Sequence, residues 1–169
     1  SKKVSLPREG EAGTSDAGCD SALHVLDATK GKELASVELD GQVGATAAVA
    51  GDVLYVGTMT NQLLAVDWKK AEVKWKFEPA KRAQPFFASA ALTEDLVIAG
   101  SRDKRVHAVN RQTGQEVWSV LTEGKVDSSP VVVGQRVFVG SQDGKDTYVV
   151  SVTGAGRARM CRRIGGGWR

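Results

Sequence analysis

An internal repeat of about 40 residues constrains the fold more than any other feature of this 169-residue sequence. Three apolar segments each end in a glycine, and they span residues 53–57, 96–100 and 136–140. The closing glycines, Gly57, Gly100 and Gly140, lie 43 and 40 residues apart. A short stretch rich in small residues precedes each segment with the same spacing, at 46–49, 89–92 and 129–132. Two sets of landmarks with one spacing indicate repeated copies of a structural unit.

Each copy continues beyond its glycine with a polar turn and a further apolar segment. These segments span 63–67, 106–110 and 147–151, and a partial earlier copy spans 23–27. Three of these segments end at an aspartate or an asparagine: Asp27, Asp67 and Asn110. Trp75 and Trp118 follow Asp67 and Asn110 by eight residues, whereas the first copy has Ala35 there. Valine, isoleucine and aromatic side chains favour strands, so each full unit predicts four short strands joined by tight turns.

A unit of about 40 residues with four strands is typical of one blade of a β-propeller. A single blade cannot bury both faces of its sheet, so neighbouring blades must stack around an axis. We therefore predict an all-β protein, a β-propeller of four-stranded antiparallel blades. About three and a half blades are expected, as a partial propeller or open arc, at residues 19–40, 43–78, 86–121 and 128–152.

The two ends of the chain depart from the repeat. Residues 1–18 form a polar segment that we expect to be degenerate or disordered, so the first blade would have two strands. Residues 153–169 form a tail rich in arginine and glycine, which we expect to lie outside the repeat and to contribute little to the fold. The fourth blade would then have three strands. Both departures lead us to expect a fragment of a larger propeller.

The third copy and the start of the fourth carry the motifs of a known repeat. The segment 106–110 is followed by Thr113-Gly114 and Trp118, and then by Ser128-Ser129-Pro130 and Val-Phe-Val-Gly-Ser-Gln-Asp-Gly at 137–144. This order resembles the PQQ-like (quinoprotein-type) propeller repeat, and the resemblance covers residues 19–152. It looks most like the bacterial propellers without assigned chemistry. The family also includes quinoprotein dehydrogenases and the propeller lipoprotein of the outer-membrane β-barrel assembly machinery.

The repeat gives eight positions a structural role and leaves the turns as candidate contact sites. The structural residues are Trp75, Trp118, Gly57, Gly100, Gly140, Asp27, Asp67 and Asn110. Both tryptophans are expected to be buried on outer strands. Turns held by a rigid scaffold are where binding residues usually lie. We therefore interpret one dense charge cluster and the aromatic pair before an inner strand as candidate partner contacts: Arg102, Asp103, Lys104, Arg105, Phe86 and Phe87.

No residue is predicted to be catalytic, and neither PQQ nor calcium is expected as a cofactor. The resemblance to quinoprotein dehydrogenases would require a pair of adjacent cysteines, whereas Cys19 and Cys161 are 142 residues apart. His24 and His107 occupy the same position in two copies, with Leu64 in the copy between them. We therefore interpret both histidines as polar packing residues and not as metal ligands or general bases.

Charge and hydropathy argue against two classes of partner. The net charge of +3 arises from five arginines in the tail 153–169, and the remainder of the chain is slightly acidic, so no nucleic-acid partner is expected. No apolar run approaches the roughly 20 residues of a membrane helix, so no membrane span is expected. The first residues contain no signal-peptide core. Relatives of this repeat are commonly exported, so the full-length parent is expected to be exported or periplasmic.

Two functions remain open. The first is a non-catalytic propeller-repeat module that acts as an interaction scaffold for an unknown protein or small ligand. The alternative is a fragment of a PQQ-dependent (quinoprotein) dehydrogenase whose catalytic residues lie outside this chain. An open arc would also expose the apolar faces of its terminal sheets, which favours self-association through the open blade edges, such as pairing of two copies into a larger ring.

Overall fold

The computed structural model describes residues 2–7, 12–17, 21–142, 146–153 and 157–165, with side chains described for residues 21–142. The described residues form sixteen strands in four sheets. The strands are β1 (Lys2–Pro7), β2 (Ala12–Ala17), β3 (Ala22–Asp27), β4 (Glu33–Glu38), β5 (Ala48–Ala50), β6 (Val53–Gly57), β7 (Leu63–Asp67), β8 (Glu72–Phe77), β9 (Ala91–Leu92), β10 (Leu96–Ser101), β11 (Arg105–Asn110), β12 (Glu116–Leu121), β13 (Val131–Val133), β14 (Arg136–Gly140), β15 (Asp146–Thr153) and β16 (Arg157–Gly165). Within these ranges no helix is long and apolar enough to cross a membrane.

Each sheet is one propeller blade built from four consecutive strands. Blades 1 to 4 have the strand orders β1-β2-β3-β4, β5-β6-β7-β8, β9-β10-β11-β12 and β13-β14-β15-β16. Neighbouring strands pair antiparallel, and in every blade the pairing of the third and fourth strands shifts register once. The predicted four-stranded antiparallel blades are confirmed. Tight turns between consecutive strands favour this arrangement because they bring neighbours in the sequence together as hairpins.

The terminal blades are complete, which corrects the expectation of two strands in the first blade and three in the fourth. β1 and β2 lie within residues 1–18 and extend the sheet beyond β3. β16 lies within residues 153–169 and pairs with β15. The expectation that both ends lack strands is therefore wrong. An outer strand forms by backbone hydrogen bonding to its neighbour, and this pairing requires no repeat motif in the strand's own sequence.

Apolar side chains pack in layers between neighbouring blades. Successive residues of a strand point to opposite faces of the sheet, so one blade presents a different apolar set to each neighbour. Three layers are buried, and their members include Leu23, Val25, Leu54 and Leu64 between blades 1 and 2; Tyr55, Trp75, Val97 and Val109 between blades 2 and 3; and Ile98, Trp118, Val137 and Val139 between blades 3 and 4. These layers hold the blades in sequence order.

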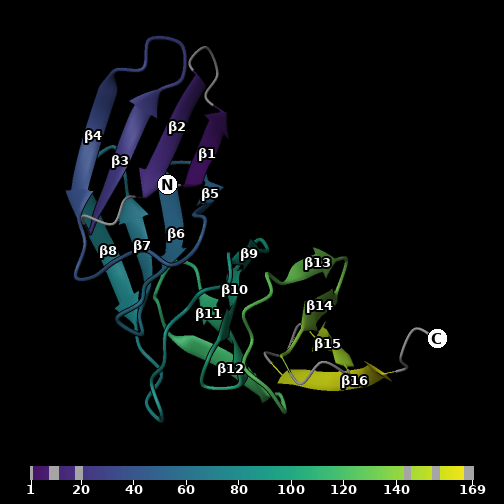
Figure 1. Cartoon of the computed structure of the whole chain (residues 1–169). Coiled ribbons are helices and arrows are strands. Elements are labelled where there is room, and N and C mark those ends of the chain that lie inside the picture. The colour runs from purple at the N-terminus through teal and green to yellow at the C-terminus, as the bar shows by residue number, and fades with distance from the viewer. Residues whose placement is uncertain (1, 8–11, 18–20, 143–145, 154–156, 166–169) are drawn as a thin grey trace.

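The four blades form an open arc (Figure 1). The innermost strands of blades 2, 3 and 4 contact one another in succession, β5 with β9 and β9 with β13. Blade 1, in purple, and blade 4, in green and yellow, stand at the two ends of this series. The predicted open arc is confirmed. In the described part of the chain, each terminal blade therefore has one sheet face that no further blade covers.

Candidate functional site

The turn between the third and fourth strands is built in the same way in blades 1, 2 and 3. The side-chain oxygen of Asp27 accepts the backbone N–H groups of Thr29 and Lys30 at 2.8 and 3.0 Å. Asp67 and Asn110 also accept the N–H groups two and three residues ahead, at 3.2 and 3.1 Å and at 2.9 and 3.0 Å. A bond from the Thr29 hydroxyl, together with these N–H groups, lowers the pKa of Asp27. The three side chains therefore stabilise turns.

Trp75 joins the outer strand of blade 2 to blade 3. Its Nε1 donates to the carbonyl oxygen of Arg111 at 2.8 Å. The indole also lies against Gly114, where an added Cβ would be 2.8 Å from Trp75 Cγ. The φ of Gly114 is +73°, which glycine adopts at little cost. Trp118 occupies the same register position in blade 3, and both rings are buried, at 9% exposure for Trp75 and 7% for Trp118.

Gly57 and Gly100 allow the connection to the next blade to approach the second strand. A Cβ on Gly57 would lie 2.5 Å from Phe86 Cβ, and one on Gly100 would lie 2.3 Å from Val126 Cγ1. Gly140 has more room, because the nearest atom to its Cβ would be 3.3 Å away. Phe86 is fully buried against Gly57. The expectation that Phe86 is a partner contact is therefore wrong, because the absence of a side chain at Gly57 makes room for its ring.

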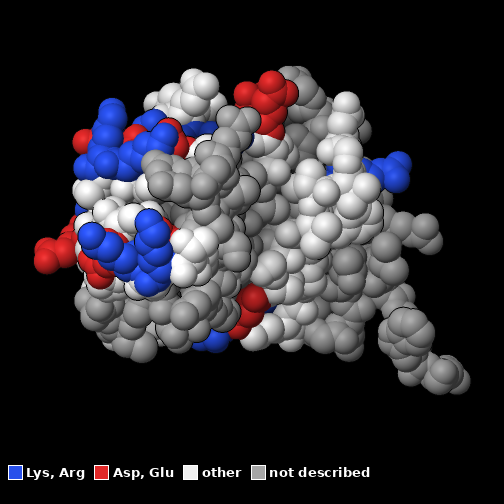
Figure 2. Space-filling view, turned by 90° about the horizontal axis from the view of Figure 1, so that it is seen from above, with Lys and Arg blue, Asp and Glu red and all other residues white. Residues whose placement is uncertain are grey.

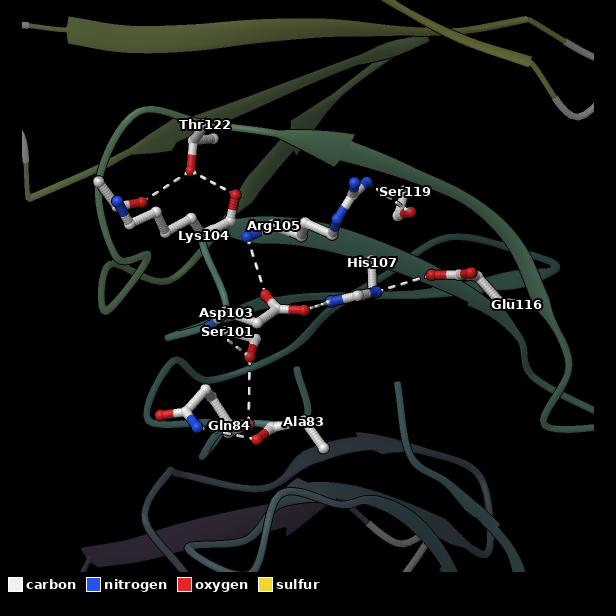
Figure 3. A network of polar contacts seen from close by, with 11 residues as sticks. Ala83, Gln84, Ser101, Asp103, Lys104, Arg105, His107, Glu116, Ser119 and Thr122 are labelled. Carbon is white, nitrogen blue, oxygen red and sulfur yellow. Dashed lines mark hydrogen bonds and ion pairs between the residues drawn. The ribbon is translucent and has the colours of Figure 1, made fainter. Parts of the chain in front are cut away.

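A network of charged side chains surrounds His107 in blade 3 (Figure 3). Its Nε2 lies 2.9 Å from Oδ2 of Asp103, and its Nδ1 lies 2.7 Å from Oε1 of Glu116. The side chains of His107 and Asp103 are 2% and 1% exposed, whereas that of Glu116 is 39% exposed. The rings of Phe77 and Phe86 cover the imidazole, with centroids 5.6 and 5.8 Å away. Both imidazole nitrogens thus face carboxylate oxygens.

Further hydrogen bonds hold this network to its own turn. Oδ1 of Asp103 accepts the N–H of Arg105 at 2.9 Å, and the N–H of Asp103 donates to Ser101 Oγ at 3.2 Å. Nη1 of Arg105 donates to Ser119 Oγ at 3.3 Å. A cavity of about 280 Å³ opens beside these groups, and its walls include Lys81, Asp103, Arg105, His107, Glu116 and Ser119. In this wall the two acids and the imidazole bond to one another.

A second cluster lies where the turn after β10 meets the connections between blades. The guanidinium of Arg102 lies over the ring of Phe87, 4.0 Å from its centroid. Its Nε and Nη2 donate to the two carboxylate oxygens of Asp127, each at 3.0 Å, and Gln142 Nε2 donates to Asp127 at 2.6 Å. The hydrogen bond to Asp127 raises the pKa of Arg102. We call these four residues, Phe87, Arg102, Asp127 and Gln142, the Arg102 cluster.

The six predicted contact residues fall into two groups. Phe87 and Arg102 belong to the Arg102 cluster and are partly exposed, and Lys104 is exposed on the same turn. Arg105 is partly exposed and bonds to Ser119 in the polar network (Figure 3). The side chain of Asp103 is buried beside His107, and Phe86 is buried as well. The prediction of a contact role is therefore wrong for Asp103 too, because its carboxylate points inward to an imidazole.

Three members of these clusters were not among the functional residues predicted from the sequence: Glu116, Asp127 and Gln142. Glu116 has a signal in the sequence, since it follows His107 by nine residues as Glu33 follows His24. In the structure His24 Nδ1 lies 3.3 Å from Glu33 Oε2, so the pair recurs in blade 1. Asp127 and Gln142 stand 40 residues after Phe87 and Arg102, at the same places in the repeat, but those places carry different residue types, so the spacing did not mark the two residues as partners.

The blades and their turns now allow comparison with known proteins. The sequence pattern of the family described as outer membrane protein assembly factor BamB matches residues 19–159. The chain belongs to this family of PQQ-repeat β-propellers. BamB from Moraxella catarrhalis is 25% identical and superimposes over 88% of this chain with a TM-score of 0.72. The computationally designed Ika8 protein is 16% identical, and its TM-score of 0.78 over 96% of this chain shows a shared fold.

A curated relative of this PQQ-repeat propeller is an enzyme. The quinohemoprotein alcohol dehydrogenase ADH-IIG of Pseudomonas putida is 28% identical over 119 residues, which cover 62% of this chain. The chain spans 17% of that dehydrogenase, 44% of the BamB chain and 48% of the Ika8 chain. The propeller repeat is common to all of them, whereas the activity of the longer proteins does not follow from it.

Proposed function

We propose that this chain is a non-catalytic propeller scaffold that binds a protein partner through the Arg102 cluster. The observation that carries the proposal is an arginine that is held in place and still 35% exposed at its side chain. Asp127 binds its guanidinium at two points, and Phe87 stacks beneath it. Arginine and aromatic side chains dominate the energetics of protein interfaces. A side chain that is ordered in advance loses less entropy on binding.

The position of the cluster supports this proposal. It joins the connection before β9, the turn after β10 and the connection before β13. The backbone N–H of Arg102 donates to the carbonyl oxygen of Pro85, and that of Val126 donates to Ser101, both at 3.1 Å. These bonds tie the turn to both connections. A surface built in this way presents its side chains from a rigid scaffold, as binding loops usually do.

The comparisons support the same class of function. The family pattern and the solved relative carry the name of an outer membrane protein assembly factor, which describes a role among other proteins. We propose in addition that the whole protein is exported and that it holds no resident cofactor. The physiological partner is defined here only by its chemistry, as a protein surface that receives an arginine and an aromatic ring.

A displayed library of random peptides, selected on the immobilised chain, tests the proposal. Selected peptides are expected to bind the Arg102→Ala variant about tenfold more weakly, because alanine removes the exposed guanidinium. Lys70→Ala is the matched control, since Lys70 is 69% exposed on the turn between β7 and β8 of blade 2 and its loss should leave binding unchanged. Circular dichroism checks that both variants fold. Peptides that bind the wild type and Arg102→Ala equally would overturn the proposal.

A quinoprotein dehydrogenase is the second candidate, favoured by the 28% identity to the alcohol dehydrogenase. Incubation with PQQ, calcium and a dye acceptor tests it, and alcohol-dependent reduction of the dye would favour the enzyme over the scaffold. Among the described residues no group of three His, Cys, Asp or Glu side chains is placed to hold a metal ion, and the buried Asp103 already bonds to His107. No catalytic step is assigned to PQQ or to calcium.

A further inference from the structure

Blade 4 exposes an apolar sheet face at one end of the arc. Val131 and Val133 on β13 are 57% and 61% exposed. Phe138 on β14 lies opposite Val131 in the register, so it shares that face, where it is half-buried. The exposed Arg136 lies opposite Val133 and is the charged residue of this part of the face. Val132 and Val137 point to the other face and pack against blade 3. In Figure 2 the described surface on the side of β13 and β14 is mainly uncharged, whereas charged side chains crowd over the opposite side of the molecule.

The repeat identifies what this face of blade 4 is built to contact. Tyr55, Ile98 and Phe138 are the third residues of β6, β10 and β14. Tyr55 is 3% exposed in the layer between blades 2 and 3, and Ile98 is fully buried in the layer between blades 3 and 4. Phe138 therefore occupies a position whose two counterparts are buried by the following blade. The chemistry of this face fits a further blade of the same kind.

Blade 1 ends the arc with the complementary face. Leu26 on β3 alternates with Leu23 and Val25, which pack against blade 2, so Leu26 points away from that blade. Val66 and Val109 are its counterparts, because each directly precedes the residue that stabilises the following turn. Both are fully buried, Val66 in the layer with blade 1 and Val109 in the layer with blade 2. Leu26 is only half-buried, so it lies where a preceding blade would pack.

We propose that two copies of this chain associate head to tail, with the open face of blade 4 in each copy against the open face of blade 1 in the other. Both contacts continue the stacking that already joins blade 1 to blade 2, blade 2 to blade 3 and blade 3 to blade 4. The chain spans 44% of BamB and 48% of Ika8, so two copies together match about one such chain in length. Two arcs of four blades make a ring of eight, within the usual range for propellers. Two identical head-to-tail contacts close that ring.

This association uses blades 1 and 4 and does not depend on the Arg102 cluster. Sedimentation velocity of the purified 169-residue chain tests it over a series of concentrations. The chain is expected to approach a dimer of about 36 kDa, twice the 17.9 kDa of one copy. Val131→Asp is expected to leave only the monomer, because Val131 lies opposite Phe138 and the new carboxylate would be buried in the contact without a cross-strand partner. A wild-type chain that is monomeric throughout the series would overturn the proposal, as would a dimer that survives Val131→Asp.

Leu121→Asp is the matched control for the introduced charge. Leu121 is 57% exposed, as is Val131, but it lies on β12 of blade 3 and outside the proposed contact. The Leu121→Asp chain is therefore expected to dimerise as the wild type does. Loss of the dimer in this control would show that any added surface charge prevents association, and would count against the proposed face.

A variant of blade 1 separates the head-to-tail arrangement from a contact between two blade 4 faces. Leu26→Asp is expected to be monomeric alone, and a dimer that persists in it would overturn the proposal. Mixing Leu26→Asp chains with Val131→Asp chains restores one unaltered contact in each mixed pair. A heterodimer is therefore expected from the mixture although neither variant dimerises by itself, and its absence contradicts the proposal. Leu26→Gln replaces Leu26→Asp where circular dichroism shows that the aspartate variant does not fold.

Discussion

At the residue scale, the charged network around His107 has an uncharged counterpart in the neighbouring blade. Leu64 in blade 2 takes the place of His107, and Thr60 takes the place of Asp103. Leu64 is fully buried, as His107 nearly is. A buried charge that loses its partner is strongly destabilising, whereas replacement of a whole buried pair is often close to neutral. We therefore infer that a blade is stable either with the polar network around His107 or with apolar and uncharged residues in its place.

Variants at these two positions test that interpretation. Asp103→Ala removes the partner of the imidazole Nε2, leaves Glu116 on Nδ1, and should lower the free energy of unfolding by about 1–3 kcal/mol. The double variant Asp103→Thr, His107→Leu gives these two positions the residues of blade 2 and leaves only the partly exposed Glu116, so its free energy of unfolding should lie closer to the wild type than that of Asp103→Ala. Urea unfolding followed by tryptophan fluorescence measures both. A double variant as unstable as Asp103→Ala would show that the loss comes from the packing of the turn and not from an imidazole nitrogen without a partner.

At the element scale, one hairpin turn serves blades 1, 2 and 3 with different side chains. Asp27, Asp67 and Asn110 each accept the N–H groups two and three residues ahead. Aspartate and asparagine are interchangeable here because both supply the accepting oxygen. In blade 3 this turn also receives the indole of Trp75 from blade 2, through Arg111. The hairpin therefore reverses the chain and also positions the neighbouring blade.

The carboxylate of Asp27 makes this turn sensitive to pH. Bonds from the Thr29 hydroxyl, then from the N–H groups of Lys30 and Thr29, hold the folded pKa of Asp27 below its ordinary value of 3.8. A carboxyl group with a depressed pKa stabilises the fold above its unfolded pKa, and that contribution is lost as pH falls through the folded pKa. Asp27→Asn keeps an accepting oxygen and removes this titration. We expect it to flatten the decline of the thermal midpoint below about pH 4.

Thermal unfolding of the wild type and Asp27→Asn, followed by circular dichroism from neutral to acid pH, measures this effect. The two curves should differ in slope at acid pH. Asp52→Asn is a suitable control, because Asp52 lies outside this turn and its carboxylate bonds to the exposed Lys69. An acid decline that is the same in the wild type and in Asp27→Asn would contradict a contribution from the turn.

At the scale of the whole molecule, each terminal blade depends on a single layer shared with its neighbour. In blade 4 that layer includes Val137 and Val139, which pack with residues of blade 3. The last strand adds a second link, because β16 pairs with β15 and also contacts β12 of blade 3. The tail 153–169, which was expected to contribute little, therefore supplies a strand that closes blade 4 and connects it to blade 3.

Deletion of residues 154–169 removes β16 and leaves one edge of β15 without a partner strand. We expect the thermal midpoint to fall by several degrees, since each kcal/mol of lost stability shifts it by roughly 2–4 °C in a chain of this size. Differential scanning calorimetry measures the change. Deletion of residues 166–169 alone is the control, because it leaves the whole of β16 in place. Equal midpoints for the longer deletion and the full chain would show that β16 does not stabilise the blade.

The sequence by itself determined the organisation within a blade. Alternating apolar residues and the turn residues at Asp27, Asp67 and Asn110 act between positions only a few residues apart, so their spacing predicts hairpins directly. The repeated tryptophan predicts an outer strand for the same reason. The period of about 40 residues then identifies the propeller, because no single blade can bury both of its faces.

Only the tertiary structure decided which side chains meet between blades and connections. Phe86 is buried against Gly57, and Arg102 pairs with Asp127, because separate segments pack together. The repeat aligns these segments but does not specify which of their side chains touch. Burial decides the role of Asp103 in the same way: a carboxylate in a turn is a surface group until an imidazole packs beside it. The strands at the two ends also appeared only in the folded chain. Their backbone groups pair with a neighbouring strand that must already be in place, and local sequence does not encode that condition.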